Sequence, residues 1–266
     1  MAYDEDMLRS LLKIRNRYLN IMEAALTGTL YGDPPTDAWK AQAGDFSARE
    51  RELGRDWRSL AQTMIGTARM RNLRHICETM IMDDIDGDFI ETGVWRGGAC
   101  IFMKAIIEAY GERGRRVFVA DSFQGLPPPN AAEYPADTGS LFHSWSNLAI
   151  SRQAVEDNFR RYGLLDDRVV FLEGWFKDTL PVAPIQKLAV LRLDGDMYES
   201  TIQALECLYH KVSRGGAVIV DDYHIHACAQ AVHDFRGKHM IDSPLLPIDG
   251  GSVWWRCDHP PICRDS

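Results

Sequence analysis

The sequence predicts an α/β protein in which helices cover both faces of a mostly parallel sheet. Five short, apolar, β-branched-rich segments alternate with stretches of helical spacing, a rhythm typical of parallel strands joined by crossover helices. Gly, Asp or charged residues flank each apolar segment, as expected where buried strands end. The 266 residues are enough for one large domain with an appendage.

Two helical regions are expected before the first strand. Apolar residues at helical spacing over residues 5–28 predict an amphipathic helix. Residues 32–56 are polar and rich in Gly, Pro and Asp, which predicts a mobile connection that acts as a lid. A second helical region should run from Trp57 to Met82. We therefore expect a helical N-terminal lid at 1–60 and a main domain at 61–266.

The main domain is expected to contain five strands, four following helices and a terminal hairpin. An Asp-Gly turn lies between two short strand-like stretches in Leu245–Cys257, and this pattern predicts an antiparallel hairpin. The predicted strands are Phe89–Thr92, Val117–Ala120, Val169–Leu172, Leu188–Leu193 and Ala217–Val220, and the predicted helices are 98–111, 151–163, 199–212 and 226–239.

Composition excludes several classes of function. The net charge of −8 gives no footprint for nucleic acid or for an anionic membrane surface. The six cysteines form no CxxC pair, so metal-ligand spacing is absent among them. The acidic N-terminus has no apolar signal core, and no run of 18 apolar residues predicts a membrane span. These features favour a cytoplasmic protein with reduced thiols.

The stretch from Asp88 to Gly98 predicts a binding site for a nucleotide-type cofactor. Gly93 follows the end of the first strand and permits a tight turn with close ligand approach. The stretch lacks GxGxxG, which argues against a dinucleotide, and its Glu91-x-Gly form favours S-adenosylmethionine. Asp121 ends the second strand and is placed to accept hydrogen bonds from ribose hydroxyls. The alternative is a glycine-rich turn with a helix cap.

Two further strand ends complete the predicted site. At the third, Gly174 and Trp175 lie where an adenine edge is expected, although Trp175 or the following Phe176 could equally be a core residue. The fourth and fifth end in Asp194-Gly195-Asp196 and Asp221-Asp222, so four carboxylates should converge at one sheet edge. Clustered carboxylates repel unless a cation intervenes, and an oxygen-rich set favours Mg²⁺. Helix N-caps would explain one acid per loop, but not two.

A bound metal suggests a chemistry for this site. A hydroxyl on a divalent ion loses its proton more easily, and a nearby carboxylate can collect that proton. Asp196 is the best candidate for this base, because one acid of its pair can bind metal while the other faces the substrate.

With these residues in place, the chain resembles the macrocin O-methyltransferase family, which methylates sugar hydroxyls on natural products. The resemblance spans roughly residues 60–240, and the N-terminal sixty residues fit only loosely. It implies a Rossmann-like class I methyltransferase fold and a homodimer acting on a glycosylated small molecule. The matching segments are TMIG at 63–66, ETGVWRGGACIF at 91–102, VADSFQGLP at 119–127, RYGLLDD at 161–167, GWFKDTLP at 174–181, LRLDGDMYEST at 191–201 and GG with DDY within 215–223.

The resemblance also implies a role for individual residues. Asp194, Asp221 and Asp222 would bind Mg²⁺, with Asp196 as the general base. Tyr31, in a segment that closes over the site, His143 and Tyr223 are candidates for substrate contact, and His224 and His226 for tuning the metal; surface positions are the alternative for the histidines. The expected S-adenosylmethionine contacts are Thr63, Met64, Glu91, Thr92, Gly93, Arg96, Asp121, Ser122, Gly174, Trp175 and Asp194.

Two other functions stay open from the sequence. A phenol or catechol O-methyltransferase would use the same fold and the same three metal acids. A non-catalytic S-adenosylmethionine-binding protein is the alternative from outside the enzymes, and the four clustered carboxylates argue against it. The acceptor pocket is expected to involve residues 1–60 and the segment Pro127–Trp145, which is otherwise a solvated loop.

Overall fold

The protein folds around a seven-stranded sheet in a computed structural model that describes residues 5–36 and 45–258. The strand order is β3-β2-β1-β4-β5-β7-β6, with β1 to β5 parallel and the last two strands antiparallel. The predicted α/β class and terminal hairpin are confirmed. The strands are β1 (Asp88–Thr92), β2 (Val117–Asp121), β3 (Val169–Glu173), β4 (Leu188–Leu193), β5 (Val212–Val220), β6 (Leu246–Pro247) and β7 (Val253–Arg256).

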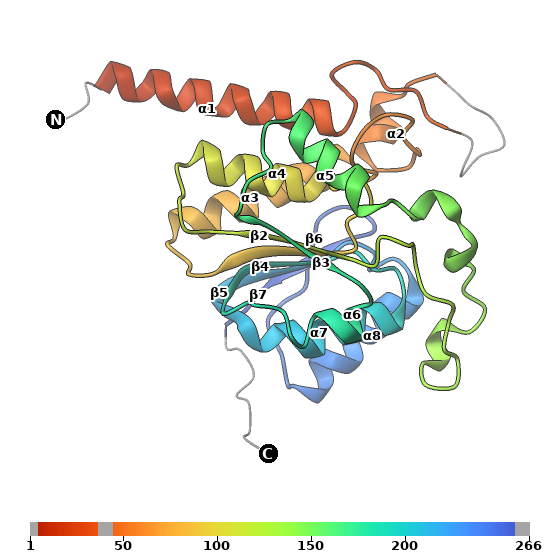
Figure 1. Ribbon diagram of the computed structural model, residues 1–266. Coiled ribbons are helices and arrows are strands. Elements are labelled where there is room, and N and C mark those ends of the chain that lie inside the picture. The colour runs from red at the N-terminus through yellow and green to blue at the C-terminus, as the bar shows by residue number, and fades with distance from the viewer. Residues whose placement is uncertain (1–4, 37–44, 259–266) are drawn as a thin grey trace.

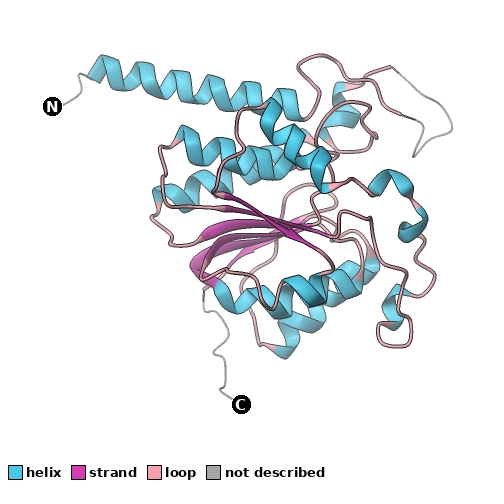
Figure 2. Cartoon of the chain, in the orientation of Figure 1, coloured by secondary structure: helices cyan, strands magenta, loops and turns pink. Residues whose placement is uncertain are grey.

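Helices cover both faces of this sheet, as Figures 1 and 2 show. The helices α3, α4 and α5 lie over one face with α1 outside them, and α6, α7 and α8 lie over the other. The longer helices are α1 (Glu5–Leu26), α3 (Thr67–Met82), α4 (Gly98–Ala109), α5 (Arg152–Arg161), α7 (Tyr198–Leu208) and α8 (His226–Lys238), and the short ones are α2 (Ala48–Glu52) and α6 (Phe176–Thr179).

Strand alternation divides the core into two layers. Phe89 of β1 packs in the layer under α3 and α4, whereas its neighbour Ile90 packs in the layer under α7 and α8. All five residues of β1 and all six of β4 are buried, as expected for central parallel strands covered on both faces. The centre of the sheet is therefore rigid, and the loops at its carboxyl edge start from fixed positions.

The prediction of helix from Trp57 onward is wrong for residues 57–66. A buried carboxylate competes for the backbone there: Asp33 accepts hydrogen bonds from the N–H groups of Leu60 and Ala61 at 2.8–3.1 Å. Arg58 is fully buried and donates to the carbonyl of Ile65. These side-chain bonds replace helical ones, so the helix begins only at Thr67.

The described part of the predicted lid is tied down by the same network. Arg51 of α2 is fully buried and donates to the carbonyl of Asp33 at 2.6 Å and to the carboxylate of Asp56 at 2.8 Å. Residues 37–44 of the predicted lid, together with 1–4 and 259–266, lie outside the described residues. No helix among the described residues is long and apolar enough to cross a membrane.

Candidate active site

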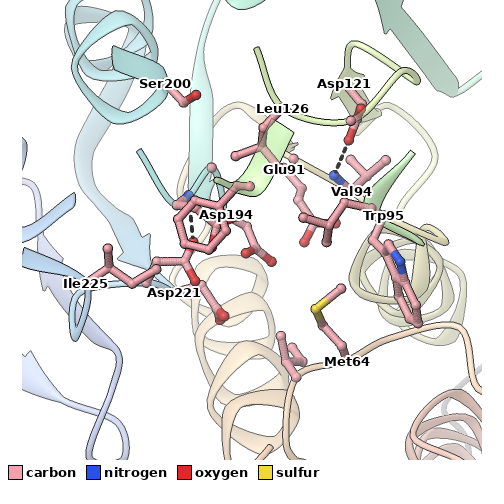
Figure 3. Close-up of a pocket in the computed structure, with 18 of the residues that line it drawn as sticks. Met64, Glu91, Val94, Trp95, Asp121, Leu126, Asp194, Ser200, Asp221 and Ile225 are labelled. Atoms are coloured by element: carbon pink, nitrogen blue, oxygen red, sulfur yellow. Dashed lines mark hydrogen bonds between the residues drawn. The ribbon is translucent and has the colours of Figure 1, made fainter. Parts of the chain in front are cut away.

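A cavity of about 980 Å³ opens at the carboxyl edge of the sheet. The strand order reverses between β1 and β4, where Thr92 pairs with Leu193, and the loops after these two strands both line the cavity. Ligands of open α/β sheets bind at such a reversal point. Figure 3 shows the result: Glu91, Asp121, Trp95 and Met64 lie on one side of the cavity, with Asp194 and Asp221 beside them.

The turn after β1 depends on Gly93. Its φ of +87° is in the left-handed region, and a Cβ there would lie 1.7 Å from the carbonyl oxygen of Asp194. Gly93 donates its N–H to Ala120 at 2.8 Å, and Asp194 donates to Thr92 at 2.9 Å. The loops after β1, β2 and β4 are thus packed backbone against backbone, which only glycine permits at this position.

Asp121 is held in place by the backbone of two loops. One carboxylate oxygen accepts from Val94 N–H at 2.8 Å and the other from Phe123 N–H at 2.7 Å. Burial raises the pKa of this carboxyl above its usual range, although the hydrogen bonds act to lower it. Each oxygen has a further lone pair. The carboxylate is therefore an oriented acceptor in the cavity wall, suited to ribose hydroxyls.

Glu91 is paired inside the protein, which the sequence analysis did not foresee. One carboxylate oxygen accepts from the Cys100 thiol at 2.9 Å, and the other is bonded to the guanidinium of Arg192. Burial raises the pKa of Glu91 to about 7, although Arg192 acts in the opposite direction. Glu91 is thus a counter-ion for Arg192 as well as a residue of the cavity wall.

Arg192 joins the two halves of the site. Its side chain is 1% exposed, and besides Glu91 it is bonded to Asp194 at 2.6 Å and to Asp221. Arg69 of α3 donates to Asp221 at 2.5 Å and to Asp249 of the terminal hairpin at 2.8 Å. The sequence contains a sign of this role of Arg192: a charged residue inside an apolar strand requires buried partners of opposite charge. Arg69 and Asp249 meet across 180 residues and gave no such signal.

The predicted metal acids come together as expected. Asp194, Asp221 and Asp222 each offer an oxygen within 4.8 Å of the others. Burial and then the neighbouring carboxylates raise the pKa of Asp222 well above its usual value. Burial also acts on Asp221, but Arg192 and Arg69 hold its pKa below the ordinary value.

These donors fit a hard divalent cation. The two guanidinium groups are bonded to Asp194 and Asp221, whereas the carboxylate of Asp222 accepts only a backbone N–H, from Asp196 at 3.0 Å, among the described residues. The cluster therefore keeps an excess of negative charge that a cation would neutralise, and its carboxylate oxygens are the ligands that Mg²⁺ prefers.

Asp196 has the properties expected of a base. Burial, followed by the charges of Asp194 and Asp221, raises its pKa to about 7. No hydrogen bond from the described residues reaches its carboxylate, and the residue lines the cavity. Its backbone adopts φ +57°, a left-handed conformation that is uncommon outside glycine. Ser200, Ile225 and Leu126, labelled in Figure 3, line the same cavity.

Most of the predicted site residues line this one cavity. They are Thr63, Met64, Glu91, Gly93, Asp121, Ser122, Gly174, Trp175, Asp194, Asp196, Asp221 and Asp222, and His224 joins them.

Five predicted residues and His226 do not line the cavity. Thr92 is buried behind it, and Arg96 donates to the carbonyl groups of Ser59 and Ala61. Both act on backbone that supports the site. Tyr31, His143 and Tyr223 also lie elsewhere, with Tyr31 bonded to the Ala25 carbonyl, His143 exposed, and the Tyr223 hydroxyl 2.7 Å from His233.

Comparison with known proteins identifies the family. The family model described as Macrocin-O-methyltransferase (TylF) matches residues 15–257. A relative from Streptomyces olivaceus, "8-demethyl-8-(2,3-dimethoxy-alpha-L-rhamnosyl)-tetracenomycin-C 4'-O-methyltransferase", is 51% identical over 91% of this chain and 93% of its own. "Demethyldecarbamoylnovobiocin O-methyltransferase" from Streptomyces niveus is 48% identical over 90% and 92%, respectively. "Mycinamicin III 3''-O-methyltransferase" from Micromonospora griseorubida is 45% identical over 90% and 95%.

Solved structures agree with these relatives. The O-methyltransferase NovP superposes with a TM-score of 0.88 at 47% identity, covering 92% of this chain and all of its own. The calicheamicin methyltransferase CalS11, at 20% identity and a TM-score of 0.57, shows the same fold. The cavity at the strand reversal, its anchored acids and these matches lead to one conclusion: the chain belongs to the Macrocin-O-methyltransferase (TylF) family and is an S-adenosylmethionine-dependent O-methyltransferase.

Proposed function

We propose that this enzyme methylates a sugar hydroxyl of a glycosylated natural product and uses Mg²⁺ to do so. The observation that carries the proposal is the buried carboxylate cluster, with Asp196 unbonded beside three acids that can share a cation. The relatives support the acceptor class, since one is named for a rhamnosyl compound and two for methylation of antibiotics, mycinamicin and novobiocin derivatives.

The chain's own residues would divide the work. Asp121 and Ser122 would hold the ribose of S-adenosylmethionine, and the wall formed by Glu91 and Gly93 its amino-acid end. Gly174 and Trp175 would border the adenine, while Thr63 and Met64 close the cavity from the side of α3. These positions direct the methyl group toward the acid cluster, where proximity and orientation supply much of the rate.

The acceptor hydroxyl would be deprotonated at Asp196. The oxygen of the acceptor would form a bond to the methyl carbon of S-adenosylmethionine as the carbon–sulfur bond breaks and a neutral thioether is left, and the Asp196 carboxylate would take the hydroxyl proton. Asp194, Asp221 and Asp222 would hold the cation, which when bound lowers the pKa of the hydroxyl and orients it.

Residues 1–60 are proposed as the lid of this site. Leu53, Gly54 and Trp57 line the cavity, so the segment that includes α2 forms part of its wall. Because the buried Arg51 donates to the carbonyl of Asp33 at 2.6 Å, the part of this segment next to Trp57 would act as a fixed wall of the cavity.

The proposed partner beyond the substrate is a second copy of the chain. Met7, Leu11, Ile14 and Ile21 of α1 are 50–62% exposed, and together with Tyr18 they repeat at spacings of four and three residues. This is the seam of a helix pair.

The test is a methyl-transfer assay on matched acceptors. Rhamnosylated tetracenomycin, mycinamicin III, demethyldecarbamoylnovobiocin and a catechol are each incubated with labelled S-adenosylmethionine, with Mg²⁺ or with EDTA. We expect turnover of a glycoside, loss of that turnover in EDTA, and a fall in kcat of at least about a hundredfold in Asp196→Asn with S-adenosylmethionine affinity retained.

The other outcomes separate the alternatives. Preference for the catechol would replace the sugar acceptor by a phenol, and full activity in EDTA would remove the metal. Cofactor binding by calorimetry without turnover of any acceptor would favour a non-catalytic binding protein. An unchanged kcat in Asp196→Asn would remove Asp196 as the base.

A further inference from the structure

Asp137 stands out in the long connection between β2 and α5. The structure describes all of residues 127–150, and Asp137 is the one buried residue among them, with 2% of its surface exposed. It ends the short 3₁₀ helix Pro135–Asp137. A carboxylate buried in an otherwise exposed loop needs hydrogen-bond donors to offset its desolvation.

Those donors are the first N–H groups of α7. One Asp137 oxygen accepts from Tyr198 at 2.7 Å and the other from Glu199 at 2.9 Å. The residue that precedes the helix, Met197, makes no side-chain cap of its own. Asp137 therefore caps α7 from sixty residues away in the chain, and a ring contact of 6.0 Å between Tyr134 and Tyr198 adds to the attachment.

The capped end of α7 directly follows the base. Asp196 lies two residues before Tyr198 with φ +57°, and Met197 donates to Gly195 at 2.5 Å in a tight turn. A non-glycine residue in this conformation is strained, and it persists only where its neighbours hold it. On one side Asp222 accepts the Asp196 N–H at 3.0 Å, and on the other Asp137 fixes the start of α7.

The connection that carries Asp137 also forms a cavity wall. Pro127, Asn130, Phe142, Trp145 and Leu148 line the same cavity as Asp196. The wall and the base turn are thus fastened together at one carboxylate.

We propose that Asp137 is a positioning residue that fixes the geometry between the acceptor wall at 127–148 and the base turn at 194–197. The inference rests on the proposed role of Asp196. Asp137 fixes the wall and the Asp196 turn relative to each other. An acceptor that binds against the wall therefore has its hydroxyl at a defined distance from Asp196. Cofactor binding, proposed at Asp121, Ser122, Gly174 and Trp175 and at the wall of Glu91 and Gly93, uses neither Asp137 nor the helix start that it caps.

The test compares Asp137→Ala and Asp137→Asn with Ser151→Ala. Ser151 caps α5, where its hydroxyl accepts from Ala154 N–H at 3.3 Å, and it does not line the cavity, so its loss is the matched control for removing a helix cap. On the best glycoside of the panel above, Asp137→Ala should lower kcat by about tenfold to a hundredfold and raise the acceptor KM, with the S-adenosylmethionine Kd within about twofold of wild type.

The conservative variant gives the second readout. Asn retains one acceptor oxygen and is itself a favourable cap, so Asp137→Asn should recover part of the kcat, and it carries the test if the alanine variant does not fold. Wild-type kcat and acceptor KM in a folded variant, or an equal kcat loss in Ser151→Ala at matched melting temperature, would overturn the proposal.

Amide hydrogen exchange separates this proposal from the proposed function. Exchange should accelerate in both 127–150 and 194–201 in Asp137→Ala, and in neither in Ser151→Ala. This result stands even if no glycoside is methylated, whereas acceleration confined to 127–150 would show that the two segments are not coupled.

Discussion

At the scale of single residues, the site is governed by how buried charges find partners. Arg192 is paired with Glu91, in the part of the cavity wall proposed for S-adenosylmethionine, and with two of the predicted metal ligands, Asp194 and Asp221. Removing a partner from such a cluster leaves an uncompensated buried charge, so the cluster is fixed as a unit. Burial, and then the neighbouring carboxylates, raise the pKa of Asp196 and of Asp222.

This clustering predicts how stability depends on pH and on Mg²⁺. The folded-state pKa of Asp196 is about 7, and those of Asp194 and Asp222 are also raised. Acids with raised pKa values favour the folded state below their unfolded pKa of about 4, and this contribution is lost as pH rises through the folded values. Mg²⁺ should therefore raise the melting temperature more at pH 8 than at pH 5.

Calorimetric melting with and without Mg²⁺ at the two pH values measures this effect. Asp222→Asn removes one of the charges, so the metal-free protein should lose less stability between pH 5 and pH 8 than wild type. An equal Mg²⁺-induced shift at both pH values would contradict the expectation.

At the scale of elements, the site depends on the turns that follow β1 and β4. Gly93 brings the first turn against the carbonyl of Asp194, and hydrogen bonds on both sides join the two loops. The cofactor side and the acid cluster are therefore adjacent because two backbones touch.

Gly93→Ala should separate these loops. The added Cβ would overlap the Asp194 carbonyl oxygen and must sit at positive φ, so we expect a loss of about 2–4 kcal/mol in unfolding free energy and weaker S-adenosylmethionine binding. Chemical denaturation and calorimetry measure the two. Gly114→Ala is the control, since nothing lies within 4 Å of its Cβ position and its φ is not positive. Wild-type cofactor affinity in Gly93→Ala would refute the packing argument.

At the scale of the whole molecule, α1 is packed along only part of its length. Only Leu19, Met22 and Leu26 of this 22-residue helix are buried, and its N-terminal half extends past the helices beneath it (Figure 1). A row of apolar side chains on a projecting helix favours association.

We expect the double variant Leu11→Asp, Ile14→Asp to be monomeric under conditions where wild type sediments as a dimer. Two buried carboxylates in a helix seam would outweigh its apolar contacts. Lys13→Asp, on the opposite side of the helix, is the control and should sediment as wild type. Sedimentation velocity measures all three, and a monomeric wild type would rule out the proposed pairing.

The parts of the fold that the sequence predicts correctly are those set by local sequence pattern. The five parallel strands and the α/β class follow from short apolar segments that alternate with segments of helical spacing. The acidic residues that follow these strands lie at one edge of the sheet because parallel strands all end there. The prediction of a helix over residues 57–66 is wrong because the carboxylate of Asp33, nearly thirty residues earlier, accepts hydrogen bonds from backbone N–H groups that a helix would use. Composition cannot register such a contact.

The sequence by itself determined that Asp194, Asp196, Asp221 and Asp222 meet beside a glycine turn, because parallel strands all end at one sheet edge. Only the tertiary structure decided what surrounds them. Arg192 is paired with Asp194, and Arg69 bridges Asp221 and Asp249. Asp137, in the connection between β2 and α5, caps α7. The physical reason is range. Periodicity acts over a few residues, whereas a buried charge takes whichever partner the packed chain places within hydrogen-bond distance.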